Sequence, residues 1–251
     1  ETLLNIVGEL VVIKSQILNE VLHLKNEPRL NSVVALLDKT IRELQGRTLS
    51  MRMTPLKSLF LKMQRVARDL SLRLGKPLEI ALTGEEIEID RTMVENLSDP
   101  LLHLVRNCLD HGLEVPERRR EKGKPEKGRL TLSAQQAGDR VVLHIADDGA
   151  GIHRERVIKK AVEAGLVDPK VDPSKLSDGE VFEFLFAPGF STAEKVTDIS
   201  GRGVGMNVVK EALNALRGRI EVSSEFGKGA AFKITVPLTT AITDGMLVSV
   251  E

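Results

Sequence analysis

The 251-residue chain lacks several residue types that particular functions need. Trp and Tyr are absent and only seven residues are Phe, so few aromatic side chains can stack on the bases of single-stranded nucleic acid. Lys and Arg together number 36, and so do Asp and Glu. This balance gives no overall attraction to a polyanion or an acidic membrane surface, and we expect no nucleic-acid partner.

Cysteine and long apolar runs are also scarce. The single cysteine, Cys108, excludes an intrachain disulfide and favours a cytoplasmic location. No apolar run approaches the roughly 20 residues that span a bilayer, so direct membrane insertion is not expected. Because the chain starts at Glu1 without Met and ends on the apolar stretch 245–248, we expect a fragment of a longer protein.

Residues 1–54 have the pattern of a helical hairpin. Apolar residues follow a 3,4 alternation from Leu3 to Leu24 and again from Leu30 to Met51, which predicts two helices packed antiparallel. A hairpin of this size buries too little apolar area to be stable alone. We therefore expect a homodimer through residues 1–54; the alternative is that the hairpin packs on its own downstream domain.

Residues 55–237 change to a mixture of helices and strands without strict alternation. This favours an α+β fold, an α/β sandwich of a mixed sheet and a helix layer, over a parallel doubly wound sheet. Residues 114–128 are expected to be a connection. The predicted helices are 56–74, 90–112, 154–164, 179–186 and 204–216, and the predicted strands are 78–82, 129–135, 140–146, 219–224 and 230–236.

The segment from residue 101 to residue 112 separates apolar from polar residues when it is wound as a helix. Asn offers a carbonyl oxygen to Mg²⁺, Arg offers charge to phosphate, and His exchanges protons near neutral pH. Such a face suits a metal-bound phosphate, and the alternative is a solvated polar face. The side expected to be buried holds Leu101, Leu102, Val105 and Leu109, and the polar side holds His103, Arg106, Asn107, Asp110 and His111.

Two glycine-containing motifs follow. Asp147 ends a predicted strand and precedes Gly149, Gly151 and Ile152. The glycines let the backbone approach a flat ligand, while the carboxylate accepts a hydrogen bond from an amine such as that of adenine; an ordinary turn is the alternative. The second motif, Gly201-Arg202-Gly203-Val204-Gly205-Met206, opens into a predicted helix and suits phosphate oxygens.

Other phosphate-binding motifs are excluded. A Walker loop needs Lys-Ser or Lys-Thr after its last glycine, a dinucleotide fingerprint needs a preceding strand, and the protein-kinase loop needs its Val-Ala-Ile-Lys partner. None of these accompanies the second glycine motif. Loop 187–203 is long enough to act as a lid, and we expect core contacts at its near end from Phe182, Phe184 and Phe186.

Asn107, the motif at 147–151, residues 182–190 and the motif at 201–205 occur in the order of the four boxes of one ATP-binding domain. Gyrase, Hsp90, histidine kinases and MutL share that domain. More narrowly, LLHLVRNCLDHGLE, DDGAGI, LFAPGFST, SGRGVGM and MRMTPLKSLF closely resemble the CheA family of chemotaxis histidine kinases. The resemblance covers nearly the whole chain and implies transfer of the γ-phosphoryl of ATP, with Mg²⁺, to a histidine.

On this resemblance Asn107 matches the Mg²⁺ ligand and Asp147 the adenine-binding carboxylate. His103 looks like the group that handles a proton or orients the γ-phosphate. Arg106, Asp110 and His111 match positions near the phosphates and the metal. The remaining ATP-binding positions are those of the two glycine motifs and the lid: Gly149, Gly151, Ile152, Ser191, Thr192, Gly201, Arg202, Gly203, Val204, Gly205 and Met206.

The chain departs from the family pattern in several places. Ala230 stands where a Thr commonly follows the last glycine pair, and Asn207 where Asp is frequent. The phosphorylated histidine of the family lies in a separate domain that is missing here. Residues 238–251 resemble the start of the family's regulatory domain, so the response regulator, the adaptor and the chemoreceptor are expected to act through missing domains.

Two other functions remain open on the sequence. The first is an ATP-hydrolysing conformational clamp of the gyrase or Hsp90 type, which the presence of His103 in place of Glu disfavours. The second is a dimer scaffold that binds no nucleotide, which Asn107 and Asp147 disfavour.

Overall fold

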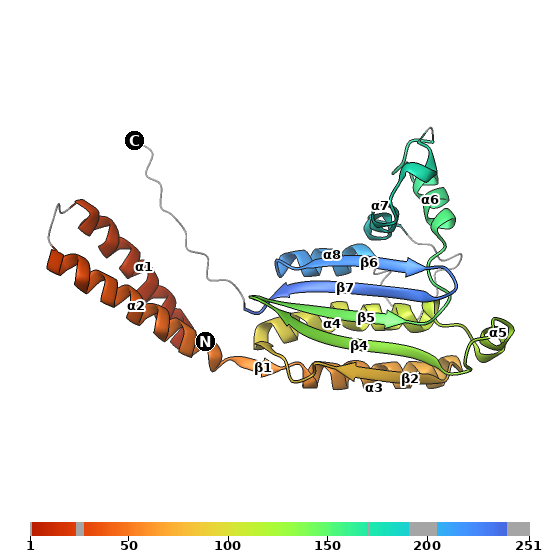
Figure 1. Cartoon of the computed structure of the whole chain (residues 1–251), viewed down its shortest axis with the longest axis horizontal. Helices are drawn as coiled ribbons and strands as arrows, with labels where there is room; N and C mark the ends of the chain where they lie inside the picture. Colours follow the sequence, from red (N-terminus) through yellow and green to blue (C-terminus); the bar gives the residue numbers. More distant parts are fainter. Residues whose placement is uncertain (1, 24–27, 170, 191–204, 240–251) are drawn as a thin grey trace. The chain divides into compact units, whose positions relative to one another are not determined.

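The computed structural model describes residues 2–23, 28–169, 171–190 and 205–239 (Figure 1). They form two compact units, one within residues 1–54 and one within residues 55–238. In the described ranges, no helix is both long enough and apolar enough to cross a membrane.

The first unit is an antiparallel pair of helices, α1 (Thr2–His23) and α2 (Pro28–Ser50). Lys14 of α1 donates a hydrogen bond to Asp38 of α2 at 2.8 Å. Because the two helices contact each other along one side only, each buries a narrow stripe. The buried residues of the described part of the pair are Val7, Val11, Val34, Ile41 and Thr48.

Much of the apolar seam seen in the sequence of α1 does not lie inside this pair. Leu3 and Ile6 are each 48% exposed, and Ile13 is 49% exposed. Helix α1 therefore has two apolar stripes, of which the contact with α2 covers one. The second stripe stays exposed in a single copy of the chain.

The second unit contains a five-stranded sheet with strand order β2-β4-β5-β7-β6. Strand β2 runs parallel to β4, and the other neighbours are antiparallel. The strands are β2 (Leu78–Thr83), β4 (Gly128–Ala137), β5 (Arg140–Asp147), β6 (Arg219–Glu225) and β7 (Gly229–Pro237), and a separate two-stranded sheet pairs β1 (Met53–Pro55) with β3 (Glu88–Asp90).

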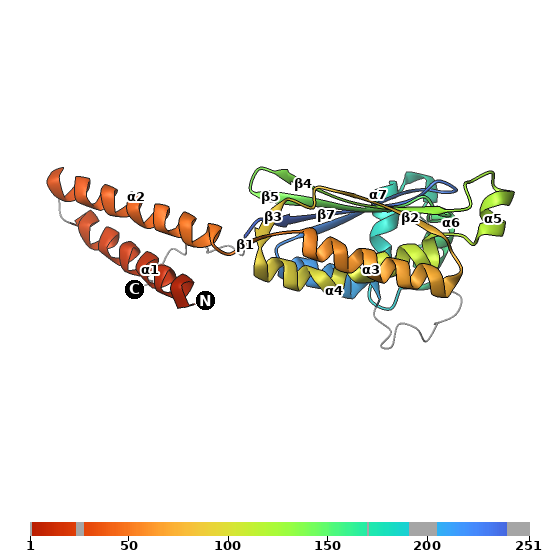
Figure 2. The ribbon, with the colours of Figure 1, turned by 90° about the horizontal axis from the view of Figure 1, so that it is seen from below.

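Helices lie on one face of this sheet and beyond its β6 edge. Figure 2 shows α3 and α4 together on one face, and α8 packs against α4, which confirms the predicted α+β fold of a mixed sheet and a helix layer. The helices are α3 (Lys57–Leu74), α4 (Arg91–Asn107), α5 (Pro116–Glu121), α6 (Arg154–Glu163), α7 (Asp178–Glu183) and α8 (Met206–Ala215), with short turns η1 (Cys108–Gly112), η2 (Pro173–Lys175) and η3 (Phe184–Phe186).

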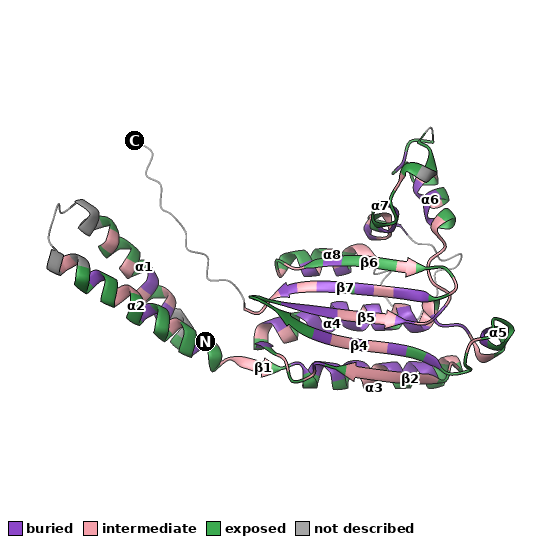
Figure 3. Cartoon of the chain, viewed as in Figure 1, coloured by how far each residue is buried: buried purple, intermediate pink, exposed green. Residues whose placement is uncertain are grey.

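The core follows from alternation along the strands and from the apolar side of α4. Leu130, Leu132 and Ala134 of β4 are buried, and the residues between them are half-buried (Figure 3). Helix α4 begins where the Asp90 side chain accepts a hydrogen bond from the Thr92 N–H at 2.8 Å, a typical N-cap. As predicted, the apolar side of this helix and its extension is buried: Leu101, Leu102, Val105 and Leu109.

The structure differs from the sequence predictions at two places near the end of α4. The α-helix ends at Asn107, and residues Cys108–Gly112 form a π-helical turn, so the predicted polar face does not continue as one α-helical surface. Segment 114–128 is not a simple connection, because it contains α5, whose start is marked by Pro116 at its first helical position.

Replacement of Leu104 by Ala is expected to lower the free energy of unfolding by about 2–5 kcal/mol, because Leu104 is fully buried between α4 and the sheet. The matched control is Leu72→Ala on α3, where the side chain is 82% exposed and the change should stay within about 0.5 kcal/mol. Urea unfolding followed by circular dichroism measures both, and equal losses would contradict the assigned core.

Candidate functional site

The polar residues at the end of α4 are distributed over two kinds of helix. His103 and Asn107 are half-buried and Arg106 is exposed on α4, while Asp110 and His111 lie in η1. The amide of Leu113 donates to the Cys108 carbonyl at 2.7 Å, the wide spacing of a π turn. Four of these residues lie close enough to interact electrostatically, since the charges of Arg106, Asp110 and His111 act on His103.

The environment of His103 favours the neutral form of its imidazole. Burial lowers the pKa of His103, and the neighbouring Arg106 and His111 lower it further, while the charge of Asp110 opposes them. A neutral imidazole can accept a proton or a hydrogen bond. The side chain therefore has the protonation state that a proton-handling group requires.

Lys76, which the sequence analysis did not single out, holds η1 in place. Its ammonium group donates hydrogen bonds to the carbonyls of Leu109 at 2.6 Å and Asp110 at 3.0 Å. Burial lowers the pKa of Lys76, and the charges of Asp110 and Glu114 oppose that shift. A cation at this end of a helix satisfies carbonyls that have no partner in the next turn.

Asp147 lies at the end of β5 and is only 8% exposed. One carboxylate oxygen accepts the Gly149 N–H at 2.9 Å. Burial raises the pKa of Asp147, while the bond from Gly149 opposes that shift. Burial and the charge of Asp147 raise the pKa of the Cys108 thiol, which stays neutral beside the carboxylate. The buried acceptor at the strand end is the feature predicted for an adenine-binding carboxylate.

The first glycine motif touches the end of η1 closely. The Ala150 N–H donates to the Gly112 carbonyl at 2.8 Å. A Cβ atom at Gly149 would lie 2.1 Å from that carbonyl oxygen, so only glycine fits at this position. Asn107 and Asp147, which are 40 positions apart in the sequence, are thereby carried by segments in direct contact.

The motif is closed on its other side by the β6–β7 hairpin. The Gly227 N–H donates to the Ala150 carbonyl at 2.7 Å, and the Ile152 N–H donates to the Ser224 hydroxyl at 2.8 Å. Ala230, the departure from the family pattern, pairs with Asp147 in the β5–β7 register and is buried. Gly151 lies between these contacts with a φ of 69°.

The start of α8 meets the end of α4. The Asn107 side-chain amide donates to the Met206 sulfur at 3.1 Å, and Gly205 immediately precedes the first turn of α8. The N-terminus of a helix attracts anions through its free N–H groups and its dipole. The other predicted positions of this motif and of the lid lie outside the described residues: Ser191, Thr192, Gly201, Arg202, Gly203 and Val204.

The predicted core anchors before the lid are in place. Phe182 and Phe186 are buried, and Phe184 is half-buried. Their side chains pack α7 and η3 into the core clusters of this unit.

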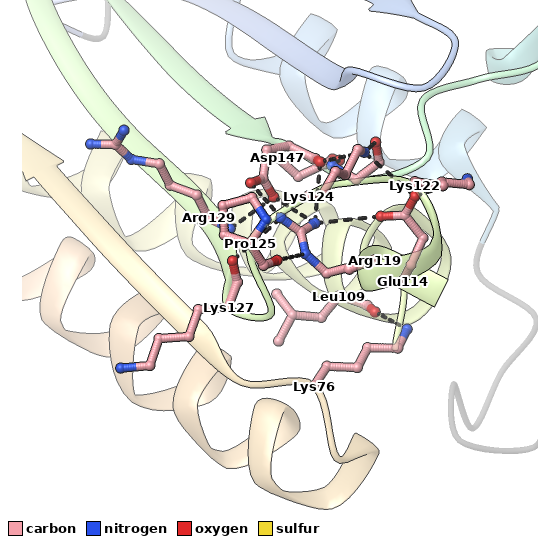
Figure 4. A network of polar contacts seen from close by, with 12 residues as sticks. Lys76, Leu109, Glu114, Arg119, Lys122, Lys124, Pro125, Lys127, Arg129 and Asp147 are labelled. Atoms are coloured by element: carbon pink, nitrogen blue, oxygen red, sulfur yellow. Dashed lines mark hydrogen bonds and ion pairs between the residues drawn. The ribbon is translucent and has the colours of Figure 1, made fainter. Parts of the chain in front are cut away.

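A network of buried charges supports the first glycine motif, and the sequence analysis missed it. Arg119 of α5 is fully buried and pairs with Asp148 at 2.7 Å and with Glu114 at 3.4 Å (Figure 4). The sequence predicted only a connection at 114–128, because single charges carry no signal of burial. A Pro at a helix start, followed by basic residues, was the one available hint.

The side chains around Asn107 suit one kind of metal ion. Within the described ranges, no group of three or more His, Cys, Asp or Glu side chains could hold a metal ion. Mg²⁺ characteristically takes few protein ligands and keeps waters and substrate phosphates. A single hard oxygen ligand such as the amide of Asn107, next to a helix N-terminus, fits a metal that arrives with a nucleotide.

Comparison with known proteins agrees with this geometry. Residues 96–240 match the family of histidine kinase-, DNA gyrase B- and HSP90-like ATPases, and residues 1–51 match the homodimeric domain of signal-transducing histidine kinases. The chain belongs to this ATPase family. Its N-terminal residues are similar to the homodimeric domain of histidine kinases, and its whole length is similar to chemotaxis proteins CheA.

Three chemotaxis proteins CheA illustrate the similarity. Over the whole length of this chain, the proteins of Salmonella typhimurium and Bacillus subtilis are 44% and 41% identical to it, and that of Klebsiella aerogenes is 45% identical. The chain covers 37%, 37% and 38% of these relatives, respectively. It therefore spans less than two fifths of their length.

The buried carboxylate of Asp147 is expected to cost stability. Because its pKa in the folded state is raised above that of the unfolded chain, its contribution is favourable at low pH and is lost as the pH rises through the folded value. Asp147→Asn should therefore melt at a higher temperature than the parent chain at about pH 8, with the difference shrinking as the pH falls towards the ordinary carboxyl pKa of 3.8. Differential scanning calorimetry measures this difference.

The control for this experiment is Asp139→Asn in the exposed β4–β5 turn, which should show no pH-dependent difference from the parent chain. A lower melting temperature of Asp147→Asn at about pH 8 would contradict the assigned cost of burial.

Proposed function

We propose that this chain is the ATP-dependent protein-histidine kinase core of a chemotaxis signalling protein. In this proposal residues 1–54 dimerise, residues 55–237 bind ATP and transfer its γ-phosphoryl group, and residues 238–251 begin a regulatory domain. The observation that carries the proposal is the convergence of three motifs, in which Asn107 bonds Met206 and Gly112 bonds Ala150.

Adenine recognition is assigned to the end of β5. The carboxylate of Asp147 has one oxygen bonded to the Gly149 N–H and retains acceptor capacity for an exocyclic amine. Gly149, Gly151 and Ile152 provide a backbone surface held in place from both sides. A buried acceptor of this kind selects a base that donates a hydrogen bond at that position.

The phosphates are assigned to the ends of α4 and α8. Asn107 would hold Mg²⁺, and Arg106, Asp110 and His111 act electrostatically on His103, which lies one helical turn before Asn107. When bound with ATP, Mg²⁺ neutralises charge on the transferred phosphoryl group. The N-terminus of α8 at Gly205 binds phosphate oxygens, and the neutral His103 accepts a proton or orients the γ-phosphate.

The acceptor histidine belongs to another domain. His103 and His111 lie in the nucleotide site, while His144 lies on β5 and His153 beside Phe226, with a ring separation of 4.6 Å. As the resemblance to the family implies, the phosphorylated group is assigned to a separate histidine-bearing domain, in trans within a dimer. A response regulator, an adaptor and a chemoreceptor would act through further domains, in the cytoplasm.

Phosphotransfer in trans tests the proposal. The chain is mixed with Mg²⁺, ATP carrying a γ-label and a separate histidine-bearing domain, and label on that domain is expected. Asn107→Ala should reduce labelling roughly 100-fold, because a group that acts on the phosphates is lost. Asn96→Ala on the exposed side of α4 is the control and should leave labelling unchanged.

The other outcomes of this experiment are decisive as well. Release of free phosphate without label on the domain would indicate that the chain is an ATP-hydrolysing clamp and not a kinase. Full labelling by the Asn107→Ala variant would contradict the role assigned to the Asn107 amide.

The homodimer is supported by the exposed stripe on α1. Leu3, Ile6 and Ile13 are about half exposed in one copy, and residues 1–51 match a homodimeric domain. Pairing two helical hairpins gives a four-helix bundle that covers such stripes.

A charge placed in this stripe should separate the subunits. Ile13→Lys is expected to raise the dimer dissociation constant at least about 100-fold, since an ammonium group would be buried without a partner. Sedimentation velocity measures the dissociation, and Gln16→Lys at an exposed position of α1 is the control. A dimer of unchanged stability in Ile13→Lys would rule out this face.

A further inference from the structure

Arg119 is an unusual residue, because its guanidinium group is fully buried on a short surface helix. It donates to both carboxylate oxygens of Asp148, at 3.0 and 2.7 Å, and to the Asp148 carbonyl at 3.3 Å. It also donates to the carbonyls of Pro125 at 2.6 Å and Lys127 at 3.3 Å, and to Glu114 at 3.4 Å. Figure 4 shows the fork of Arg119 at the centre of this network.

The charge of Arg119 is balanced by nearby carboxylates, which makes its burial possible. Burial would raise the pKa of Glu114, but the bond from Lys122 and the charge of Lys124 outweigh it and lower that pKa. Glu114 therefore stays ionised beside the guanidinium. A buried ion pair is tolerated only when such bonds satisfy its remaining donors and acceptors, and a planar fork meets a carboxylate better than an ammonium does.

The network ends on the backbone that carries Asp147. Besides the bonds from Arg119 to Asp148, the Lys124 ammonium donates to the carbonyl of Asp148 at 2.8 Å and to that of Gly149 at 2.6 Å. The Gly149 N–H in turn donates to the Asp147 carboxylate at 2.9 Å. The side chains of Arg119 and Lys124 thus hold the peptide groups on the C-terminal side of Asp147 in place.

We propose that Arg119, assisted by Lys124, is a positioning residue that sets the selectivity of this site for adenine. The proposal rests on the proposed nucleotide function and adds a determinant outside the ATPase motifs. Arg119 acts through Asp148 and Gly149 on the orientation of the Asp147 carboxylate. Its effect should therefore fall on the hydrogen bond to the base, and phosphate binding by Asn107 and Gly205 should be spared.

The test compares two nucleotides that differ at one group. ATP carries the amine that the Asp147 carboxylate accepts from, whereas inosine triphosphate has a carbonyl oxygen there and cannot donate. Calorimetric titration with Mg²⁺ gives the dissociation constants of both for the parent chain and for Arg119→Lys, which keeps the charge but loses the fork. Arg120→Lys, on the exposed side of α5, is the matched control.

Arg119→Lys is expected to weaken ATP binding about tenfold, equivalent to about 1.4 kcal/mol, and to change inosine triphosphate binding less than about twofold. Lys124→Met provides a second variant that leaves the Arg119 fork in place, so it guards against a folding defect; it should also lower the preference for ATP. Its control is Lys127→Met, whose side chain is exposed.

The outcomes separate this inference from the proposed function. If the parent chain binds neither nucleotide, the proposed function fails, and this inference fails with it. If the parent chain prefers ATP and both variants keep that preference, or lose affinity for both nucleotides equally, the positioning role alone is overturned.

Discussion

The nucleotide site depends on how closely η1 approaches the end of β5. The Gly112 carbonyl accepts the Ala150 N–H at 2.8 Å, and a side chain at Gly149 would collide with that carbonyl. This contact joins the segment that carries Asn107 to the segment that carries Asp147. The apolar side of α4 is buried in the core, so the core holds this contact in place. The position of the contact in turn fixes the positions of the motifs around it.

Charge burial is the second constraint on the site. Asp147 is desolvated in the folded chain, and its raised pKa records that cost. Burial favours the neutral forms of the Cys108 thiol and of the His103 imidazole. On the other side of the loop, Arg119 and Lys124 donate hydrogen bonds to its backbone carbonyls. The proposed function of Asp147 and the stability of the fold are therefore opposed at this residue.

The fold was largely predictable because its signals are local. The alternation along β4, the cap at Asp90 and the apolar side of α4 can all be recognised in the sequence and agree with the structure. The π turn at Cys108 was not predictable, and Lys76, which donates hydrogen bonds to the carbonyls of Leu109 and Asp110 in this turn, lies more than 30 positions away in the sequence. Nor was the burial of Arg119, whose partners Glu114 and Asp148 lie at different sequence distances and have no periodicity.

The amino-acid sequence by itself determined which chemical groups are available and which elements carry them. These are an amide at the end of a helix, a carboxylate at the end of a strand, and glycines where the protein backbone must come close to a ligand. These are properties of neighbouring residues and of helical or strand periodicity. Only the tertiary structure decided that Asn107 meets Met206, that Gly112 meets Gly149, and that Arg119 is enclosed beneath Asp148. Such contacts join residues far apart in the chain, and they are selected by the packing of the whole core.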